Sequence, residues 1–370
     1  MADDNWKITS YSRKYDFENV IFCNDNATGL KAVIAIHDTT LGPAAGGCRM
    51  WTYSTEWDAV EDAMRLARGM TYKYAAAGLN LGGGKTVIIG DPKRDKSESL
   101  FRALGRFLER LGGIYLTGED VGTTLRDMEY IANETRYVIT LPKSFGGAGP
   151  IGGATAYGVI QGMQAAVMKD RKTESLEGLT VVVQGLGAVG YEVVKQLNSM
   201  GAKLVVSDID KEKVNAIQEK FHVDVVSPLE VYDSPMDIFS PCALGGILNQ
   251  DTIKRLKCSI VAGSANNQLK TEEDGYAVER KGIIYVPDFV LNAGGTIYDT
   301  DRIFHGSHEH ERAMEKVGRI KETVKKVFEL SEAEKIPTFL AADRLAEKRI
   351  LEVGNAKKIR TQAGSTLLST

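Results

Sequence analysis

A glycine-rich turn at residues 185–190 limits the possible folds of this chain more than any other feature. The turn consists of Gly185, Leu186, Gly187, Ala188, Val189 and Gly190. It follows an apolar run at 180–184 and opens a segment with helical spacing. There the first glycine permits a tight turn, the second lets a diphosphate approach the backbone, and the third lets helix and strand pack closely. Unpaired N–H groups at the helix start favour the same anion. The pattern therefore predicts a dinucleotide-binding turn.

An acidic residue supports this prediction and indicates the cofactor. Asp208 ends the next predicted strand, ~20 residues after the turn, where a carboxylate binds the hydroxyls of the cofactor ribose. No Lys or Arg occupies 207–209, and Asp210 adds a second negative charge. A 2′-phosphate would be repelled, so NAD is favoured over NADP. A glycine turn without a ligand is disfavoured, because strand, turn, helix and acid all agree.

Strand-like and helix-like segments alternate along the chain, which is typical of α/β folds. Around the turn, strands are predicted at 180–184, 203–208, 224–226, 237–239, 259–262 and 283–286, and helices at 155–169, 188–200 and 211–221. Six strands are the number found in a complete dinucleotide-binding domain. Earlier in the chain, strands are predicted at 30–37, 86–89 and from 114, and helices at 55–69 and 97–111.

The length of 370 residues and this pattern predict an α/β protein of two domains. We expect an N-terminal α/β substrate and oligomerisation domain at 1–145 and 332–370, to which the C-terminal helices return. A doubly wound, NAD-binding Rossmann domain is expected at 146–331. The glycine-rich stretch 145–153 between them predicts a hinge.

Composition excludes several other classes of protein. A net charge of −3 gives no support for a nucleic-acid partner. The four cysteines show no paired spacing, which argues against a zinc site or disulfide framework and suits a reducing compartment. No apolar run approaches the ~18 residues of a membrane span, and residues 1–6 do not resemble a signal peptide. We expect a soluble, cytoplasmic protein without a metal or a membrane partner.

Two lysines and an aspartate are candidates for catalysis. Lys73 lies just past the predicted helix 55–69, and Lys85 follows three glycines, so backbone surrounds its amine. Partial burial and a second nearby cation both favour the neutral amine, the form that acts as a base. Asp120 ends a strand. The residues alone leave the alternatives open, namely solvated lysines and an aspartate that caps a helix.

Three asparagines follow apolar segments of the second predicted domain. Asn266 and Asn267 follow 259–262, and Asn292 precedes two glycines. Amides beyond the carboxyl ends of parallel strands face the crevice where ligands bind in doubly wound sheets. The alternative is that these asparagines only form turns.

Eight segments together resemble a known enzyme family. They are GPAAGGCR (42–49), GMTYK (69–73), LGGGK (81–85), EDVGTT (119–124), QGLGAVG (184–190), SPCALGGILN (240–249), GSANNQL (263–269) and PDFVLNAGG (287–295). The family is that of the glutamate/leucine/phenylalanine/valine dehydrogenases, and the resemblance is closest to its leucine dehydrogenases. It covers nearly the whole chain.

The resemblance implies NAD-dependent, reversible oxidative deamination of an L-amino acid to its 2-oxo acid and ammonium. It implies that Lys85 is the general base, that Asp120 shuttles protons and that Lys73 pairs with the substrate carboxylate. Further implied substrate contacts are the backbone at Gly46 and Gly47, and the side chains of Asn267 and Asn292. Implied cofactor contacts are Thr155 at the nicotinamide amide, the turn with Ala188 and Val189, and Asp208, Ile209, Ala243, Ala265 and Asn267. Domain closure would exclude water before hydride transfer.

The implied side-chain pocket departs from the leucine dehydrogenase pattern. Those enzymes usually have Leu where this chain has Ala45, Ala at Gly118, and Val at Thr296 and Asp299. The smaller residues predict a larger pocket. A glycine at position 118 is similar to the pattern of the phenylalanine and tryptophan dehydrogenases. Asp299 either favours a substrate with a distal amine or hydroxyl, or turns outwards, since a buried unpaired carboxylate is costly. The segment 150–155 also lacks the proline usual before Thr155, which predicts a looser hinge.

Leucine and branched-chain amino acids are the first expectation for the substrate, and aromatic or other bulky or polar amino acids the alternative. A non-catalytic NAD-binding protein is the alternative from a different class, and Lys73, Lys85 and Asp120 argue against it. A hydroxy-acid dehydrogenase would show a His–Asp or His–Arg constellation, whereas three of the histidines lie in a polar stretch at 305–310. The resemblance also implies a homo-oligomer, often an octamer in this family.

Overall fold

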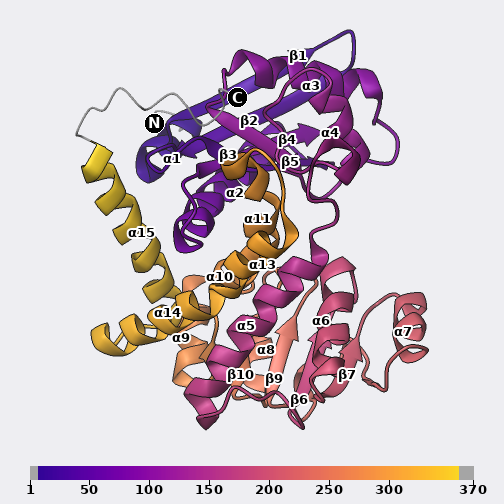
Figure 1. Cartoon of the computed structure of the whole chain (residues 1–370), viewed down its shortest axis with the longest axis vertical. Helices are drawn as coiled ribbons and strands as arrows, with labels where there is room; N and C mark the ends of the chain where they lie inside the picture. Colours follow the sequence, from indigo (N-terminus) through magenta and orange to yellow (C-terminus); the bar gives the residue numbers. More distant parts are fainter. Residues whose placement is uncertain (1–6, 358–370) are drawn as a thin grey trace, which may run out of the picture. The chain divides into compact units, whose positions relative to one another are not determined.

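The computed structural model describes residues 7–357. The expectation about a leader at 1–6 and the C-terminal end of the domain division, 358–370, lie outside the described residues. The chain forms two compact units, which are described separately (Figure 1). The first unit runs to Gly149 and includes Asp299–Glu309 and the chain from Ala346 on. The second unit comprises Pro150–Tyr298 and His310–Leu345.

The first unit is built on a five-stranded mixed sheet with the order β1-β2-β4-β3-β5. Its strands are β1 (Asn19–Asp25), β2 (Leu30–Asp38), β3 (Ala44–Trp51), β4 (Gly82–Ile89) and β5 (Tyr115–Glu119). β1 and β2 are antiparallel, as are β2 and β4, while β3 runs parallel to both β4 and β5. The sequence analysis did not identify β1 or β3. In β3 the reason is clear, because AAGG has the composition of a turn and low strand propensity.

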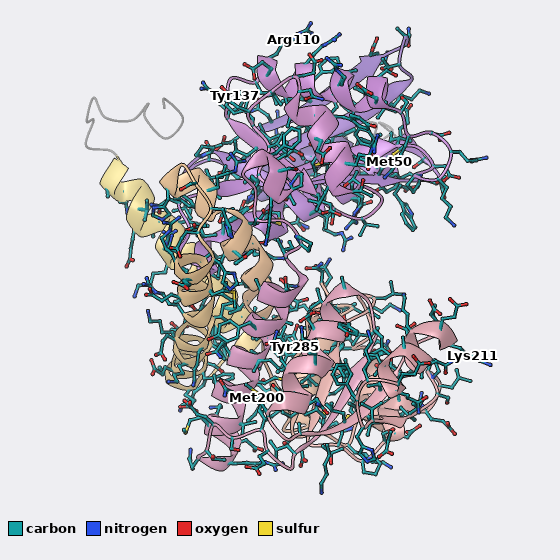
Figure 2. The ribbon with its side chains drawn as sticks, turned by 45° about the vertical axis from the view of Figure 1, so that its right-hand side comes forward. Met50, Arg110, Tyr137, Met200, Lys211 and Tyr285 are labelled. Carbon is teal, nitrogen blue, oxygen red and sulfur yellow. The ribbon has the colours of Figure 1, made fainter. Side chains whose placement is uncertain are left out.

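Helices cover both faces of this sheet (Figure 1). On one face α2 (Glu56–Ala76) packs small residues such as Ala63 against Val33 and Val87. On the other face α3 (Glu98–Arg110) and α4 (Leu125–Ala132) enclose a core with Tyr115 and the fully buried Met50, which Figure 2 labels. The remaining helices of this unit are α1 (Lys7–Tyr15), α12 (Asp301–His305) and a 3-10 turn, η1 (Lys143–Phe145).

The expected end of α2 was wrong. The helix continues past Gly69 to Ala76, so that Lys73 lies in its last turn and not beyond it. An internal glycine costs a helix only about 1 kcal/mol relative to alanine, which tertiary packing overrides. The chain leaves the helix just before Gly78, which has a positive φ of 73°.

The three glycines before Lys85 belong to strand β4, which begins four residues before the predicted strand. Gly83 lies directly under α2, where a Cβ atom would collide with the backbone amide and hydroxyl of Thr71. On the opposite face, a Cβ at Gly84 would lie 2.6 Å from the ring of Tyr115. The absence of side chains therefore lets α2 rest on the strand backbone and fixes the start of β4.

The second unit contains a six-stranded, all-parallel sheet with the order β11-β10-β9-β6-β7-β8. Its strands are β6 (Thr180–Gln184), β7 (Lys203–Ser207), β8 (Asp224–Val225), β9 (Ile238–Pro241), β10 (Ile260–Val261) and β11 (Ile284–Tyr285). The order reverses beside β6, as in doubly wound dinucleotide-binding folds. The predicted α/β fold is confirmed, and each of the six predicted strands is present in the described chain.

Helices flank this sheet. The principal ones are α5 (Gly152–Arg171), α6 (Ala188–Ser199), α7 (Lys211–Gln218) and α14 (Ile320–Glu334), with α5 packed against both α6 and α14. Lys211 at the start of α7 and Tyr285 in β11 are labelled in Figure 2. The others are η2 (Val231–Asp233), α8 (Gln250–Arg255), α9 (Glu272–Arg280), α10 (Asp288–Leu291), α11 (Ala293–Asp299), α13 (His310–Gly318) and α15 (Thr338–Lys357), of which α11 and α15 continue into the first unit.

Within residues 7–357, none of the helices is both long enough and apolar enough to cross a membrane. Over the same residues, no group of three or more His, Cys, Asp and Glu side chains is arranged to hold a metal ion.

The packing of α2 on β4 can be tested with a pair of glycine variants. We expect Gly83→Ala to destabilise the protein by about 3 kcal/mol, because the added methyl group meets helix backbone that cannot move independently. Gly69→Ala is the matched control, since that glycine is exposed on α2 with open space around it, and it should stabilise the protein by up to about 1 kcal/mol. Urea unfolding measures both. Equal stability of the two variants would contradict the described packing.

Candidate active site

Lys85 and Asp120 form a buried ion pair in the first unit. Lys85 Nζ lies 2.7 Å from Asp120 Oδ2, and only 6% of the lysine side chain is exposed. Lys85 belongs to β4, while Asp120 follows β5, so the pair spans the intervening strand β3. A Cβ at Gly47 on β3 would lie 2.7 Å from the Asp120 Cβ. A glycine at this position therefore allows the two charged side chains to meet above β3.

Arg49 extends the pair into a network. Its Nε donates to Asp120 Oδ2 at 3.0 Å, and its Nη1 donates to Asp62 Oδ2 on α2 at 2.9 Å. The Tyr53 hydroxyl donates to the same Asp62 oxygen at 2.7 Å. We call these five residues, Lys85 included, the Lys85 network. The sequence analysis assigned no role to Arg49, although it lies in the segment 42–49, and no spacing signal marks Asp62 or Tyr53.

The charges of this network determine the state of Asp120. Burial by itself would raise the pKa of the Asp120 carboxyl, but the Lys85 ammonium and the Arg49 guanidinium outweigh it and hold the pKa at about 2. Asp120 is therefore ionised at neutral and alkaline pH. The site offers a fixed anion beside a buried amine.

The other predicted substrate residues of the first unit lie near this network. Gly46 follows Ala45 on β3, and its carbonyl accepts a hydrogen bond from the Tyr115 hydroxyl at 2.8 Å. A Cβ at Gly46 would lie 3.3 Å from the Met70 side chain of α2. Lys73 follows Met70 by one helical turn on a partly exposed stretch of α2. The end of α2 therefore lies over the glycines of β3.

Asp299 lies in the first unit and does not turn outwards. It is 5% exposed, and Thr140 Oγ1 donates to its Oδ2 at 2.5 Å. A Cβ at Gly118 on β5 would lie 2.6 Å from the same hydroxyl. Burial raises the pKa of the Asp299 carboxyl to about 7, although the Thr140 hydrogen bond and the Arg302 charge oppose the shift. Thr296 belongs to the second unit.

In the second unit the glycine turn has the geometry of an anion site. Gly185 has a positive φ of 98°, as a tight turn requires, and a Cβ at Gly190 would collide with the Gly185 carbonyl. Gly187 has open space around it and, like Ala188, is exposed at the start of α6. The free helix N-terminus and the bare backbone fit a diphosphate.

Asp208 follows β7 directly and is bound to the glycine turn. One carboxylate oxygen accepts from the Leu186 amide at 2.6 Å, and the other accepts from the Asp210 amide at 2.8 Å. Two other predicted cofactor contacts lie close by. Ile209 follows Asp208 and is 89% exposed, and Ala243 is so near the turn that a Cβ at Gly185 would collide with it. The acidic residue and the turn thus form one structural element, and each carboxylate oxygen keeps a second lone pair for a ligand.

The predicted amides also lie in the second unit, in the segments after β10 and β11. Asn267 has a positive φ of 51°, and its carbonyl accepts from the Gly246 amide at 2.7 Å. Asn292 is buried, and its Nδ2 donates to Asn266 Oδ1 at 2.8 Å. The Ala265 amide donates to Pro241 in β9. Thr155 is buried on α5, and its hydroxyl donates to the Ile151 carbonyl at 3.1 Å.

Comparisons with known proteins match both the N-terminal and the C-terminal part of the chain to one enzyme family. The model for the Glu/Leu/Phe/Val dehydrogenase dimerisation domain matches residues 17–137, and that for Glutamate/Leucine/Phenylalanine/Valine dehydrogenase matches 146–212 and 206–357. A leucine dehydrogenase from Thermoactinomyces intermedius is 56% identical over 93% of each chain. A phenylalanine dehydrogenase from Bacillus thermotolerans is 44% identical over 96% of this chain and 94% of its own.

Among solved structures, the crystal structure of L-tryptophan dehydrogenase from Nostoc punctiforme matches with a TM-score of 0.80. It is 42% identical and covers 94% of this chain and 99% of its own. The family models and the full-length relatives agree with the resemblance found in the sequence. The chain belongs to the glutamate/leucine/phenylalanine/valine dehydrogenase family.

Proposed function

We propose that this protein catalyses the NAD-dependent, reversible oxidative deamination of an L-amino acid, with leucine and the branched-chain amino acids as its first substrates. The buried pair of Lys85 and Asp120, 2.7 Å apart, is the observation that carries the proposal. The extent of identity to the leucine dehydrogenase supports the leucine-type assignment. Aromatic amino acids are the second candidate, favoured by the phenylalanine and tryptophan dehydrogenase relatives and by the small residues Ala45 and Gly118.

In this reaction the α-carbon loses hydride and the amine becomes an imine, which water hydrolyses. The balanced reaction is amino acid, NAD⁺ and water to 2-oxo acid, ammonium, NADH and a proton. The nicotinamide supplies the hydride acceptor. The protein supplies the base, the charges that hold the substrate, and the alignment.

Lys85 is the proposed base for the amine and for the attacking water, because the resemblance to the family implies this role and the structure buries its amine and holds it in place through Asp120. Lys73 and the backbone of Gly46 and Gly47 are proposed to hold the substrate carboxylate. The low pKa of Asp120 favours an ionised partner that aligns Lys85 and receives its N–H bond, over a group that stores the proton itself. Asn267 and Asn292 are proposed as further substrate contacts.

Membership of this family implies a nicotinamide cofactor. We propose NAD, because the carboxylate of Asp208 lies at the glycine turn and would repel a 2′-phosphate. The proposed contacts are Thr155, the turn 185–190, Asp208, Ile209, Ala243, Ala265 and Asn267. We further propose a homo-oligomer, in line with the dimerisation domain matched at 17–137. An octamer is the assembly that the resemblance to the family suggests. The four free cysteines suit the proposed location in the cytoplasm.

Loss of Lys85 tests the proposed function. We expect the protein to produce NADH from leucine and NAD⁺ at alkaline pH, and Lys85→Ala to lower kcat at least about 1,000-fold, since the base is removed. Lys93→Ala, at an exposed turn of the same unit, should leave the rate unchanged. Full activity of Lys85→Ala would refute the assignment, and NAD binding without turnover of any amino acid would favour a non-catalytic protein.

Cofactor choice is tested at Asp208. We expect Asp208→Asn to raise KM for NAD about 10-fold, because a charged hydrogen bond to the ribose becomes a neutral one. The amide oxygen can accept from only one of the two backbone N–H groups that bind the carboxylate, those of Leu186 and Asp210, so thermal melting must show that the variant stays folded. KM for NADP should fall in the same variant because the repulsion is removed. A KM for NAD that did not change would show that the carboxylate serves the turn alone.

The role of Arg49 is tested through pH dependence. Arg49→Met removes one of the two cations that lower the pKa of Asp120, so that pKa should rise from about 2. An NMR titration of the Asp120 carboxyl measures this rise, and kcat at alkaline pH should fall about 10-fold because Arg49 no longer holds the carboxylate beside Lys85. Arg65→Met is the matched control, since Arg65 also pairs with Asp62 but does not contact Asp120. An unchanged pKa of Asp120 together with an unchanged kcat in Arg49→Met would exclude the positioning role.

A further inference from the structure

A buried carboxyl oxygen of Asp299 has no hydrogen-bond partner within residues 7–357. Thr140 satisfies Oδ2, whereas Oδ1 is fully enclosed and accepts nothing. A buried carboxyl oxygen without a hydrogen bond loses its hydration and gains nothing in return, which is unfavourable. Native structures retain such an atom mainly where water or a ligand completes it. Asp299 Oδ1 is therefore a candidate ligand contact.

The strand registers place the Thr140 hydroxyl, which binds Asp299, on the same face of the sheet as Lys85. Gly118 on β5 pairs with Gly47 on β3, and the pairs on either side place Gly47 level with Lys85 on β4. Laterally paired residues of neighbouring strands project on the same face of a sheet. Two strand spacings, roughly 10 Å, thus separate the backbone of Lys85 from that of Gly118.

Glycines form the floor between Lys85 and Asp299. Neither Gly47 nor Gly118 carries a side chain, and Thr140 occupies the place that a Cβ at Gly118 would need. Thr140 in turn holds Asp299. The glycine at 118 therefore leaves room for the Thr140 hydroxyl that holds Asp299 on this face of the sheet.

Other charged groups act on this carboxyl. Arg302 Nη2 donates to the Val138 carbonyl at 2.6 Å, while its buried Nε has no acceptor within the described chain. Arg302 and Glu119 act on Asp299 with opposite signs. Since the pKa of Asp299 is raised to about 7, the group is a carboxylate at the alkaline pH that favours deamination. In that form Oδ1 is a strong acceptor.

We propose that Asp299 Oδ1 accepts a hydrogen bond from the side chain of the substrate, so that the enzyme prefers L-amino acids bearing a side-chain donor, a hydroxyl or an ammonium. This inference rests on the proposed function and refines its leucine-type assignment. Of two side chains with the same length and branching, the one with the donor is the better substrate. An apolar side chain leaves the carboxylate unpaired, which lowers kcat/KM for such a substrate relative to its donor-bearing isostere.

Isosteric amino-acid pairs test this preference. Threonine and valine, and homoserine and norvaline, exchange a hydroxyl for a methyl group, while ornithine and norleucine exchange an ammonium for a methyl group. In the wild type at alkaline pH, we expect kcat/KM to be about 10- to 100-fold higher for the donor-bearing member of at least one pair. The pair with the largest ratio identifies the hydroxyl or the ammonium as the donor.

Two variants assign the preference to Asp299. Asp299→Val should abolish or reverse the ratio and raise kcat/KM for the apolar member. Asp299→Asn should also lose the ratio, because its amide keeps an oxygen for Thr140 and presents N–H where Oδ1 was an acceptor. Because asparagine has nearly the same shape as aspartate, Asp299→Asn still tests the proposal if the valine variant fails to fold. Thermal melting shows whether each variant is folded. Asp91→Asn, in a turn outside the sheet floor, should keep the wild-type ratio.

The outcomes separate the two proposals. Turnover of leucine by the wild type, with equal rates within every pair or with faster apolar members, would overturn the role of Asp299 and leave the deamination assignment intact. An unchanged ratio in both Asp299 variants would overturn it as well. Absence of turnover with every amino acid would overturn both proposals.

Discussion

The ion pair between Lys85 and Asp120 is the interaction on which the rest of the first unit depends. A buried ammonium is tolerated only when an opposite charge and good geometry accompany it. Here the two charges come from strands that are not neighbours, so the strand between them must be bare where they cross it. Arg49 then holds the carboxylate from the side and ties it to α2 through Asp62. The amine is thereby placed with little freedom before any ligand arrives.

The two units use glycine for the same purpose in different ways. In the first, Gly83 brings the backbone of α2 against β4, which carries Lys85. In the second, Gly190 brings α6 against the turn, which leaves its N-terminal N–H groups exposed. In both places close packing of backbone, and not a particular side chain, sets the position of the reactive groups.

The sequence predicted the second unit well because its signals are local. Apolar strands, the turn 185–190 and Asp208 each follow within a short stretch, and each is present in the structure. The first unit was predicted less completely. Its strand β3 is made of small residues without strand propensity, and the partners of Asp120 and Asp299 come from distant segments. Arg49, Asp62 and Thr140 were missed because only tertiary contacts bring them to the site, and no periodicity records such contacts.

The double attachment of Asp208 has a consequence for how this protein can diverge. One carboxylate both braces the turn through Leu186 and forms the negative surface beside it. A lineage that began to use a phosphorylated coenzyme would have to replace that charge and, at the same time, find another acceptor for the Leu186 amide. Such a shift demands paired substitutions whose single intermediates are handicapped. The choice of coenzyme and the shape of the glycine turn are therefore coupled through one carboxylate.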